Sequence, residues 1–313
     1  MKTAERLKRA LQNPRLFARG VNRAYHRRGG FRSHNPAGID VFDEDWDTLV
    51  ILDACRYDMF EEVNHLEGHL TERISKGSAT TEWLKANLDG RDLRDTVYVT
   101  ANPQFERNRE KIDVTFHDVV NVWLDEGWDD DSGTVLAETM TEAGMVAHDR
   151  YPQKRIVVHY MQPHFPFVPS SICHYKGHLE SINDADDTPD GENIWNKKFL
   201  NQTAVSDKDL WRFYNQNLKY VLDYIDKLAK LVNGKLVVTS DHGNFVGERA
   251  TPIRIREYGH HRGLYDDVAI RVPWLVHFAG DRRDISKGET KYQENKYELD
   301  ILENRLNDLG YVE

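Results

Sequence analysis

The sequence predicts an α/β protein, a three-layer α/β/α sandwich with a doubly wound, mostly parallel central sheet. Short apolar runs rich in β-branched residues recur along the chain, and helical patterns separate them. Strands that alternate with helices in this way are typical of a parallel sheet covered by helices on both faces. The 313 residues, of which 39% are apolar and 30% charged, are enough for one large domain with a sizeable core.

The predicted strands are five apolar runs. Their apolarity is continuous rather than alternating, which fits strands that are covered on both faces. In chain order they are TLVILDA (48–54), TVYVTAN (96–102), RIVVHYM (155–161), KLVVTSD (235–241) and VPWLVHF (272–278).

Helical patterns lie between and after these strands. TTEWLKANL (80–88) follows the first strand, and TVLAETMTEAGMVAHDR (134–150) precedes the third. Apolar residues recur at helical intervals in 207–232, and YELDILENRLNDLG (297–310) is typical of a closing helix that ends at Gly310. The acidic segment SINDADDTPDGEN (181–193) contains proline and glycine and indicates a surface loop.

The first 36 residues are predicted to form a basic, partly helical arm, and residues 37–313 a single domain. Up to residue 32 the arm carries ten lysines and arginines against a lone Glu5. Its helical apolar stripe is interrupted near Pro14 and consists of Leu7, Leu11, Leu16, Phe17 and Val21. One interpretation is peripheral contact with an anionic membrane or polymer. The other is a helix that packs on the acidic body of its own chain or of a partner subunit.

Composition excludes several classes of protein. The net charge of -10 disfavours nucleic-acid binding, and no apolar run approaches the roughly 20 residues that cross a bilayer. The basic N-terminus lacks the apolar core of a secretory signal. Cys55 and Cys173 are too few for a disulfide framework and lack CxxC metal spacing. We therefore expect a reducing, cytoplasmic location, at most peripheral to a membrane.

Oxygen and nitrogen donors follow the predicted strands. This is where ligands bind in open α/β sheets, beyond the carboxyl ends of the strands. Each donor alone is an ordinary turn former or structural residue, but their repetition at one sheet edge indicates a site. The donors are Asp53, Asn102, His159 with His164, and Asp241 with His242.

Three local segments strengthen this prediction. VVTSDHGNFVGE (237–248) supplies a carboxylate and an imidazole directly after a strand, and Gly243 permits a sharp turn around what they hold. In HYMQPHFPF (159–167) two prolines stiffen the loop around His164. YGHHRGLYDD (258–267) places His260 and His261 behind a glycine.

A fourth segment, SKGSATTEWLKANL (75–88), opens a helix with hydroxyl groups. The hydroxyls of Ser78, Thr80 and Thr81 can serve as ordinary helix caps. A hydroxyl beside the N–H groups of a helix start can also be a metal ligand and a nucleophile.

Taken in order, these segments resemble the sulfatase family of the alkaline phosphatase superfamily. VILDACRYDMF (50–60) is similar to the first metal-binding strand end, GSATTEW (77–83) to the nucleophile turn and MQPHFPF (161–167) to the PHxPY-like loop. The most specific similarity is SDHG (240–243) followed by YGHHRGLYDDVAIRVPWLV (258–276). The resemblance spans roughly residues 47–277 and implies an alkaline phosphatase-like catalytic domain.

The resemblance also implies roles for individual residues. The ligands it implies for a divalent ion are Asp53, Asp241, His242 and Thr80. Thr80 would also be the nucleophile. His164 and His260 would face the leaving group or the non-bridging oxygens, or help to hold a second metal, which His159 could join. Mixed nitrogen and oxygen ligands favour Mn²⁺ or Zn²⁺, with Ca²⁺ as the third candidate.

The nucleophile turn departs from that of formylglycine sulfatases, which have Cys or Ser followed by x-Pro-x-Arg. Here the turn reads SATTEW, so the resemblance implies a Thr nucleophile in a hydrolase of phosphate, phosphonate or sulfate esters, with Ser78 as the alternative nucleophile. The substrate would be a small molecule or a glycan or lipid ester. Arg56 and Asn102 are candidate substrate-binding residues, and Cys55 is expected to be a bystander. The competing functions are a phospho-group transferase acting on a lipid or cell-surface glycan, and a non-catalytic binding module.

Overall fold

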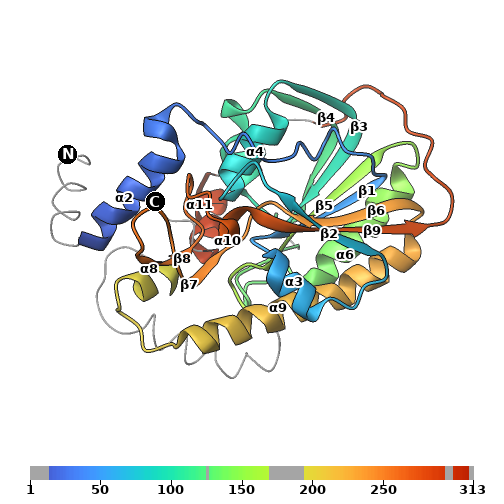
Figure 1. The fold of residues 1–313 in the computed structure, drawn as a ribbon. Helices are drawn as coiled ribbons and strands as arrows, with labels where there is room; N and C mark the ends of the chain where they lie inside the picture. Colours follow the sequence, from blue (N-terminus) through green and yellow to red (C-terminus); the bar gives the residue numbers. More distant parts are fainter. Residues whose placement is uncertain (1–13, 125–126, 169–193, 293–298, 310–313) are drawn as a thin grey trace.

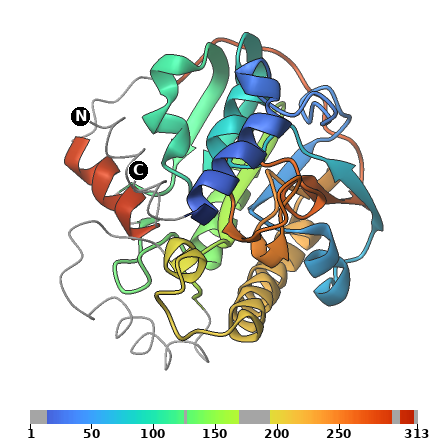
Figure 2. The same cartoon turned by 60° about the vertical axis from the view of Figure 1, so that its left-hand side comes forward.

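The computed structural model describes residues 14–124, 127–168, 194–292 and 299–309 (Figures 1 and 2). The helices are α2 (Pro14–His26), η1 (Arg28–Gly30), α3 (Tyr57–Val63), α4 (Thr80–Leu88), α5 (Gln104–Arg107), η2 (Arg109–Lys111), α6 (Ala137–Arg150), α8 (Ile194–Phe199), α9 (Asp207–Leu231), α10 (Asp267–Ile270) and α11 (Leu299–Asp308). The strands are β1 (Thr48–Asp53), β2 (His69–Ile74), β3 (Arg91–Thr100), β4 (Val114–Asn121), β5 (Arg155–Pro163), β6 (Gly234–Ser240), β7 (Phe245–Arg249), β8 (Arg256–Gly259) and β9 (Arg271–Ala279).

The central sheet has seven strands in the order β2-β9-β6-β1-β5-β3-β4. β6, β1, β5, β3 and β4 are parallel, whereas β9 runs antiparallel to both β6 and β2. The predicted fold class is confirmed, and all five predicted strands are present. The expected parallel direction is wrong for β9, because burial on both faces makes a strand apolar whichever way it runs. β2 and β4 were not predicted, since HLTERI and VTFHDVVN mix polar with apolar residues.

β1 lies at the centre of the sheet and contributes side chains to the core on both faces of the sheet. Side chains of a strand point alternately to its two faces. Val50 and Leu52 pack with the apolar side chains of α6 and α9, whereas Leu49 and Ile51 pack with Trp83 of α4. Figure 1 shows α3, α6 and α9 below the sheet and α4 above it. The three layers therefore hold the carboxyl end of β1 in the interior.

The predicted helices are present with small differences in their bounds. α4 spans the predicted residues, α6 begins later than expected at Ala137, and α9 ends at Leu231. α11 lies within the predicted closing helix, whereas Gly310, the predicted loop 181–193 and Cys173 lie outside the described residues. Among the helices that the structure describes, none is long and apolar enough to cross a membrane.

The basic segment packs on the body of the chain through α2. Arg19 forms two hydrogen bonds with the carboxylate of Glu257 in β8, one of them 2.9 Å long from Nε. Asn22 exchanges two 2.8 Å hydrogen bonds with the backbone of Ile253. Of the predicted apolar stripe, Leu16 packs against the core, whereas Phe17 is 63% exposed. The buried polar residues Arg19 and Asn22 lie outside that stripe. Residues 1–13 lie outside the described part, and the division at residue 36 stays a prediction.

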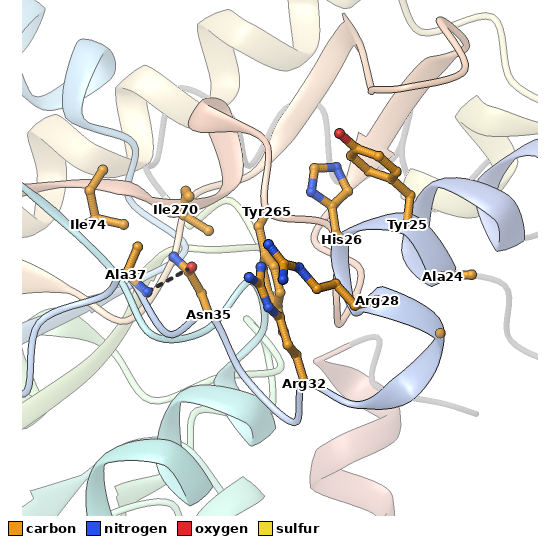
Figure 3. Close-up of a pocket in the computed structure, with 11 residues that line it drawn as sticks. Ala24, Tyr25, His26, Arg28, Arg32, Asn35, Ala37, Ile74, Tyr265 and Ile270 are labelled. Carbon is orange, nitrogen blue, oxygen red and sulfur yellow. Dashed lines mark hydrogen bonds between the residues drawn. The ribbon is translucent and has the colours of Figure 1, made fainter.

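A hollow of about 730 Å³ lies beside this helix (Figure 3). Its walls come from the end of α2, from η1 and the segment after it, and from Ile74, Tyr265 and Ile270 of the body.

Candidate active site

Two aspartates meet at the carboxyl ends of the central parallel strands. β1 ends in Asp53 and β6 is followed directly by Asp241, and neither side chain is accessible to solvent. The chain turns after Asp53 because Ala54 adopts a left-handed conformation, with φ of 61°. Its amide then donates a 3.0 Å hydrogen bond to Asp241 Oδ1. A non-glycine residue in this conformation stores strain, which is a common property of functional sites.

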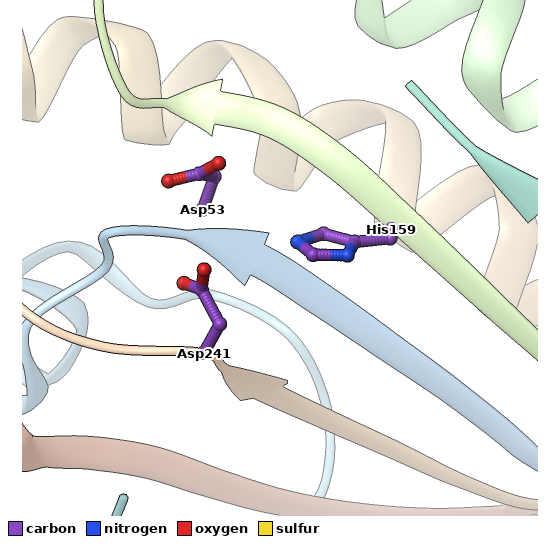
Figure 4. Close-up of side chains that lie close together, drawn as sticks. All are labelled: Asp53, His159 and Asp241. Carbon is purple, nitrogen blue, oxygen red and sulfur yellow. The ribbon is translucent and has the colours of Figure 1, made fainter. Parts of the chain in front are cut away.

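His159 joins these aspartates from β5, the strand that pairs with β1. One nitrogen or oxygen atom from each of Asp53, His159 and Asp241 lies within 4.8 Å of the others, and Figure 4 shows the three side chains facing one another. His159 Nδ1 lies 2.7 Å from the hydroxyl of Tyr98, so Nε2 is the atom turned to the carboxylates. Burial lowers the pKa of His159 to about 4, and the ring is therefore neutral at pH 7.

Thr80 contacts the same group of residues from the first position of α4. Its Oγ1 lies 3.4 Å from Asp53 Oδ2 and 3.2 Å from His242 Nε2. His242 Nδ1 donates to the carbonyl oxygen of Gly243 at 2.8 Å, so Nε2 is the ring nitrogen turned to Thr80, whose single proton has two neighbours, this nitrogen and Asp53 Oδ2. The hydroxyl is thus held between a carboxylate and an imidazole.

This arrangement fits a divalent cation. His242 Nε2 lies 3.3 Å from Asp241 Oδ2 and 3.8 Å from Asp53 Oδ1, so this ring nitrogen faces two carboxylates in the interior. In the described part of the chain, Asp241 Oδ2 and His159 Nε2 are buried without a hydrogen-bond partner. Buried polar atoms are otherwise almost always paired, and buried carboxylates repel one another. A cation among these donors would remove both costs.

A pair of histidines lies next to His242. His164 Nε2 and His260 Nε2 are 2.8 Å apart, and the ring of His260 stacks on that of His242 with centroids 4.5 Å apart. His164 Nδ1 donates to the carbonyl oxygen of Phe165, so its Nε2 accepts the proton on His260 Nε2. Burial lowers the pKa of His164 to about 4, and burial with the neighbouring rings holds the pKa of His260 well below its usual value. Both rings are therefore neutral at pH 7.

Ser78, the alternative nucleophile, has different surroundings. Its Oγ donates toward Glu82 Oε2 and the carbonyl oxygen of His261, both at 3.1 Å, and accepts from the amide of Gly263 at 2.9 Å. Glu82 is buried and also receives the hydroxyl of Tyr265 at 2.7 Å. Glu82 was not predicted from the sequence. It follows Ser78 by four residues at the start of a helix, and this spacing could have indicated a contact between the two side chains.

The glycine of the SDHG segment is needed for a reason other than the predicted one. Gly243 does not adopt a left-handed conformation. A Cβ atom there would lie 2.1 Å from the carbonyl oxygen of Val268. The close approach of the α10 segment therefore requires a glycine.

The two candidate substrate-binding residues contact protein groups. Asn102 Nδ2 donates to Asp53 Oδ2 at 2.7 Å, which orients that carboxylate. Arg56 is buried and forms ion pairs of 2.6 Å with Asp58 and 2.5 Å with Glu248. The role of both residues in substrate binding stays a prediction.

Cys55, which follows the strained residue, is fully buried. Burial, with Asp58 and Asp241 nearby, raises the pKa of its thiol well above the ordinary value. The thiolate that reacts as a nucleophile is therefore disfavoured.

The fold and this group of residues define a sulfatase-like protein of the alkaline phosphatase superfamily. The sulfatase family model matches residues 75–302, and the chain belongs to that family. Membership indicates an enzyme that acts on sulfate or phosphate esters and uses a divalent metal, for which the Asp53, His159 and Asp241 cluster is a candidate site. No curated protein matches the chain in sequence.

Several solved structures are similar to this chain at low sequence identity. The C-terminal periplasmic domain of EptC from Escherichia coli, in complex with Zn, is 15% identical over 78% of this chain and 76% of that one, with a TM-score of 0.47. The phosphoethanolamine transferase EptA from Neisseria meningitidis is 15% identical, with a TM-score of 0.48; the match covers 74% of this chain but only 47% of that integral membrane protein. The 2-O GAG sulfatase BT1596 is 11% identical over 79% of this chain and 66% of that one, with a TM-score of 0.44.

These comparisons correct one expectation from the sequence. The cytoplasmic location is contradicted, because several of the similar structures are described as periplasmic domains. A small number of cysteines does not distinguish a reducing compartment from an oxidising one, and this was the weak step in that inference.

Proposed function

We propose that this protein is a metal-dependent hydrolase of phosphate, phosphonate or sulfate esters, with Thr80 as its nucleophile. The observation that carries the proposal is the position of Thr80 Oγ1, 3.4 Å from Asp53 Oδ2 and 3.2 Å from His242 Nε2 at the start of α4. A hydroxyl becomes nucleophilic when a base or a cation stabilises its deprotonated form.

The residues that would hold the metal are Asp53, Asp241 and His242, with Thr80 and His159 beside them. Their mixture of carboxylate oxygen and imidazole nitrogen suits Mn²⁺ or Zn²⁺ better than Ca²⁺. When bound, such an ion lowers the pKa of the nucleophile and neutralises charge on the ester oxygens.

The side chains of the site supply the nucleophile, its orientation and a proton for the leaving group. The Thr80 hydroxyl loses its proton to solvent water, its oxygen forms a bond to the phosphorus or sulfur atom, and the bond from that atom to the leaving oxygen breaks. Asn102 holds the Asp53 carboxylate in place through its 2.7 Å hydrogen bond. The His164–His260 pair carries a proton between its Nε2 atoms and can offer it as a hydrogen bond to the departing oxygen. Water then cleaves the ester on Thr80.

The second step decides between hydrolysis and transfer. If an alcohol group of a lipid or glycan replaces water, the same intermediate on Thr80 makes the protein a transferase. The non-catalytic alternative differs from both, because no ester would form on Thr80.

The test is an activity assay with controlled metal. The full chain is treated with EDTA, reloaded with Mn²⁺, Zn²⁺ or Ca²⁺, and assayed on p-nitrophenyl phosphate, bis-p-nitrophenyl phosphate, phenylphosphonate and sulfate esters. Added glycerol tests transfer, through the ratio of glyceryl ester to free phosphate or sulfate. Absence of turnover with every metal and ester, in both arms, would overturn the proposal.

Two matched variants test the nucleophile. Thr80→Ala should lower kcat about 1,000-fold or more and abolish the adduct that mass spectrometry detects on Thr80. Ser78→Ala should keep the adduct and most of the activity, because Ser78 Oγ contacts Glu82 and Gly263 instead of Asp53. Full activity of Thr80→Ala would contradict the assignment.

A further inference from the structure

The hollow beside α2 is basic and separate from the candidate active site. Arg28 and Arg32 line it, together with the aromatic rings of Tyr25 and Tyr265, and none of its lining residues is acidic. Figure 3 shows both arginine side chains reaching toward Tyr265. No residue of the Asp53, Thr80 and His242 cluster lines this hollow.

The two arginines differ from their neighbours in having no counter-ion. In the described part of the chain, neither the Arg28 nor the Arg32 guanidinium forms an ion pair or a side-chain hydrogen bond. The preceding arginines of the segment are engaged: Arg19 by Glu257, and Arg23 by the carbonyl oxygen of Arg262 at 2.8 Å. Both guanidinium groups are always charged, and both line the same hollow. An anion between them would reduce the repulsion between the two positive charges.

Asp266, which follows the lining residue Tyr265 in sequence, contacts other groups than the two arginines. Asp266 lies 3.3 Å from His26 Nε2 and accepts the hydroxyl of Thr251 at 2.6 Å. It therefore supplies no partner for the arginines. An anion from outside the chain can pair with both guanidinium groups.

The backbone that carries Arg28 is held in an unusual conformation. Arg28 has φ of 47°, and Gly29 and Gly30 follow with φ of 69° and 103°. Glycine adopts these angles without strain, but arginine does not. Strain of this kind is typically retained where a side chain must be presented to a ligand.

We propose that the hollow is a second binding site, which takes a phosphate or sulfate group between Arg28 and Arg32. The forked donors of guanidinium match pairs of oxygens on such a group. The volume of about 730 Å³ leaves room for part of the attached molecule against the two tyrosine rings. The group comes from a soluble ester or from the head group of an anionic lipid. Phe31, which is 96% exposed between the two arginines in sequence, gives the lipid source a physical basis.

The first test is calorimetric titration of the full chain with inorganic phosphate in EDTA. EDTA removes metal from the candidate active site, so that binding reports on the hollow. Wild type should bind phosphate saturably, and Arg28→Gln/Arg32→Gln should bind about tenfold more weakly or not at all. The control Arg107→Gln/Arg150→Gln removes two exposed arginines elsewhere and should change affinity by less than about twofold. Equal affinity of the Arg28/Arg32 variant and wild type, or no saturable binding by wild type, overturns the site.

A second experiment identifies whether the phosphate or sulfate group belongs to a soluble ester or to a lipid. Co-sedimentation is measured with phosphatidylcholine vesicles that contain or lack phosphatidylglycerol. If the Arg28/Arg32 variant loses vesicle binding and the control variant keeps it, the hollow binds the phosphate of a lipid head group. If both double variants bind vesicles equally but the Arg28/Arg32 variant no longer binds phosphate, the hollow binds the phosphate or sulfate group of a soluble ester. Circular dichroism and thermal unfolding confirm the fold, and the single variants replace the double variant if it does not fold.

Discussion

Replacing Arg19 by methionine should lower the free energy of unfolding by about 3–5 kcal/mol, the usual cost of leaving one member of a buried ion pair alone. The carboxylate of Glu257 is fully buried and receives two hydrogen bonds from Arg19. Without them it keeps the amide of Tyr258 at 3.1 Å and His261 Nε2 at 3.6 Å. These contacts are too weak to compensate for a desolvated charge. Methionine retains part of the apolar contact that the Arg19 guanidinium, 3.6 Å from the ring centroid, makes with Phe199.

The assay is urea unfolding followed by near-UV circular dichroism, in a double-mutant cycle with Glu257→Gln. Arg19→Met/Glu257→Gln leaves no buried charge and should be more stable than Arg19→Met alone. Arg15→Met is the matched control, because Arg15 lies on the same helix, 4.6 Å from the same ring, and donates a 3.1 Å hydrogen bond to the backbone oxygen of Arg256. It should cost about 1 kcal/mol or less. The reasoning is refuted if Arg19→Met costs no more than Arg15→Met.

Two further predictions concern the candidate active site. Asn102→Ala removes the donor that lies 2.7 Å from Asp53 Oδ2. Metal affinity or kcat/KM should therefore fall about 10- to 100-fold, while the far-UV circular dichroism spectrum stays unchanged. Unaltered activity and metal affinity would show that Asp53 needs no such support. In metal-free protein, stability should decline as the pH falls through 6.5 toward 4, because the unfolded chain protonates His159 first while burial keeps its folded-state pKa at about 4. This one residue should account for about 2 kcal/mol of the decline in urea unfolding free energy between pH 8 and pH 5. His159→Asn should remove that part of the pH dependence, and equal declines in both proteins would contradict the prediction.

Sequence patterns were sufficient for the strands that carry the site, because these strands are buried on both faces. β1, β5 and β6 are continuously apolar and end next to polar residues, so both the sheet edge and the convergence of Asp53, His159 and Asp241 could be predicted. The direction of β9 could not, since an apolar pattern carries no information on strand direction. The contact between Arg19 and Glu257 joins residues 238 positions apart and has no local pattern at all.

Small residues near the site were harder to interpret than the strands. Ser78 and Thr80 lie in the same turn, and only the three-dimensional structure shows that Thr80 faces Asp53 while Ser78 faces Glu82. Side-chain direction at a helix start changes with each position, so the order of hydroxyls along the chain does not decide it. Asn102 was a candidate because it follows a predicted strand; in the structure its amide donates to Asp53, and its contact with substrate stays a prediction.

The hydrogen bond from the Ala54 amide to Asp241 joins residues 187 positions apart, and the Thr80–His242 contact spans 162 positions. Contacts so distant along the chain raise the contact order, and high contact order slows folding. During synthesis the donors cannot assemble before His242 has left the ribosome. Until then Asp53 and Thr80 belong to a partial sheet that lacks β6. A metal ion that needs all of these donors therefore binds only after β6 has joined β1, and it stabilises contacts between distant parts of the chain instead of starting the fold.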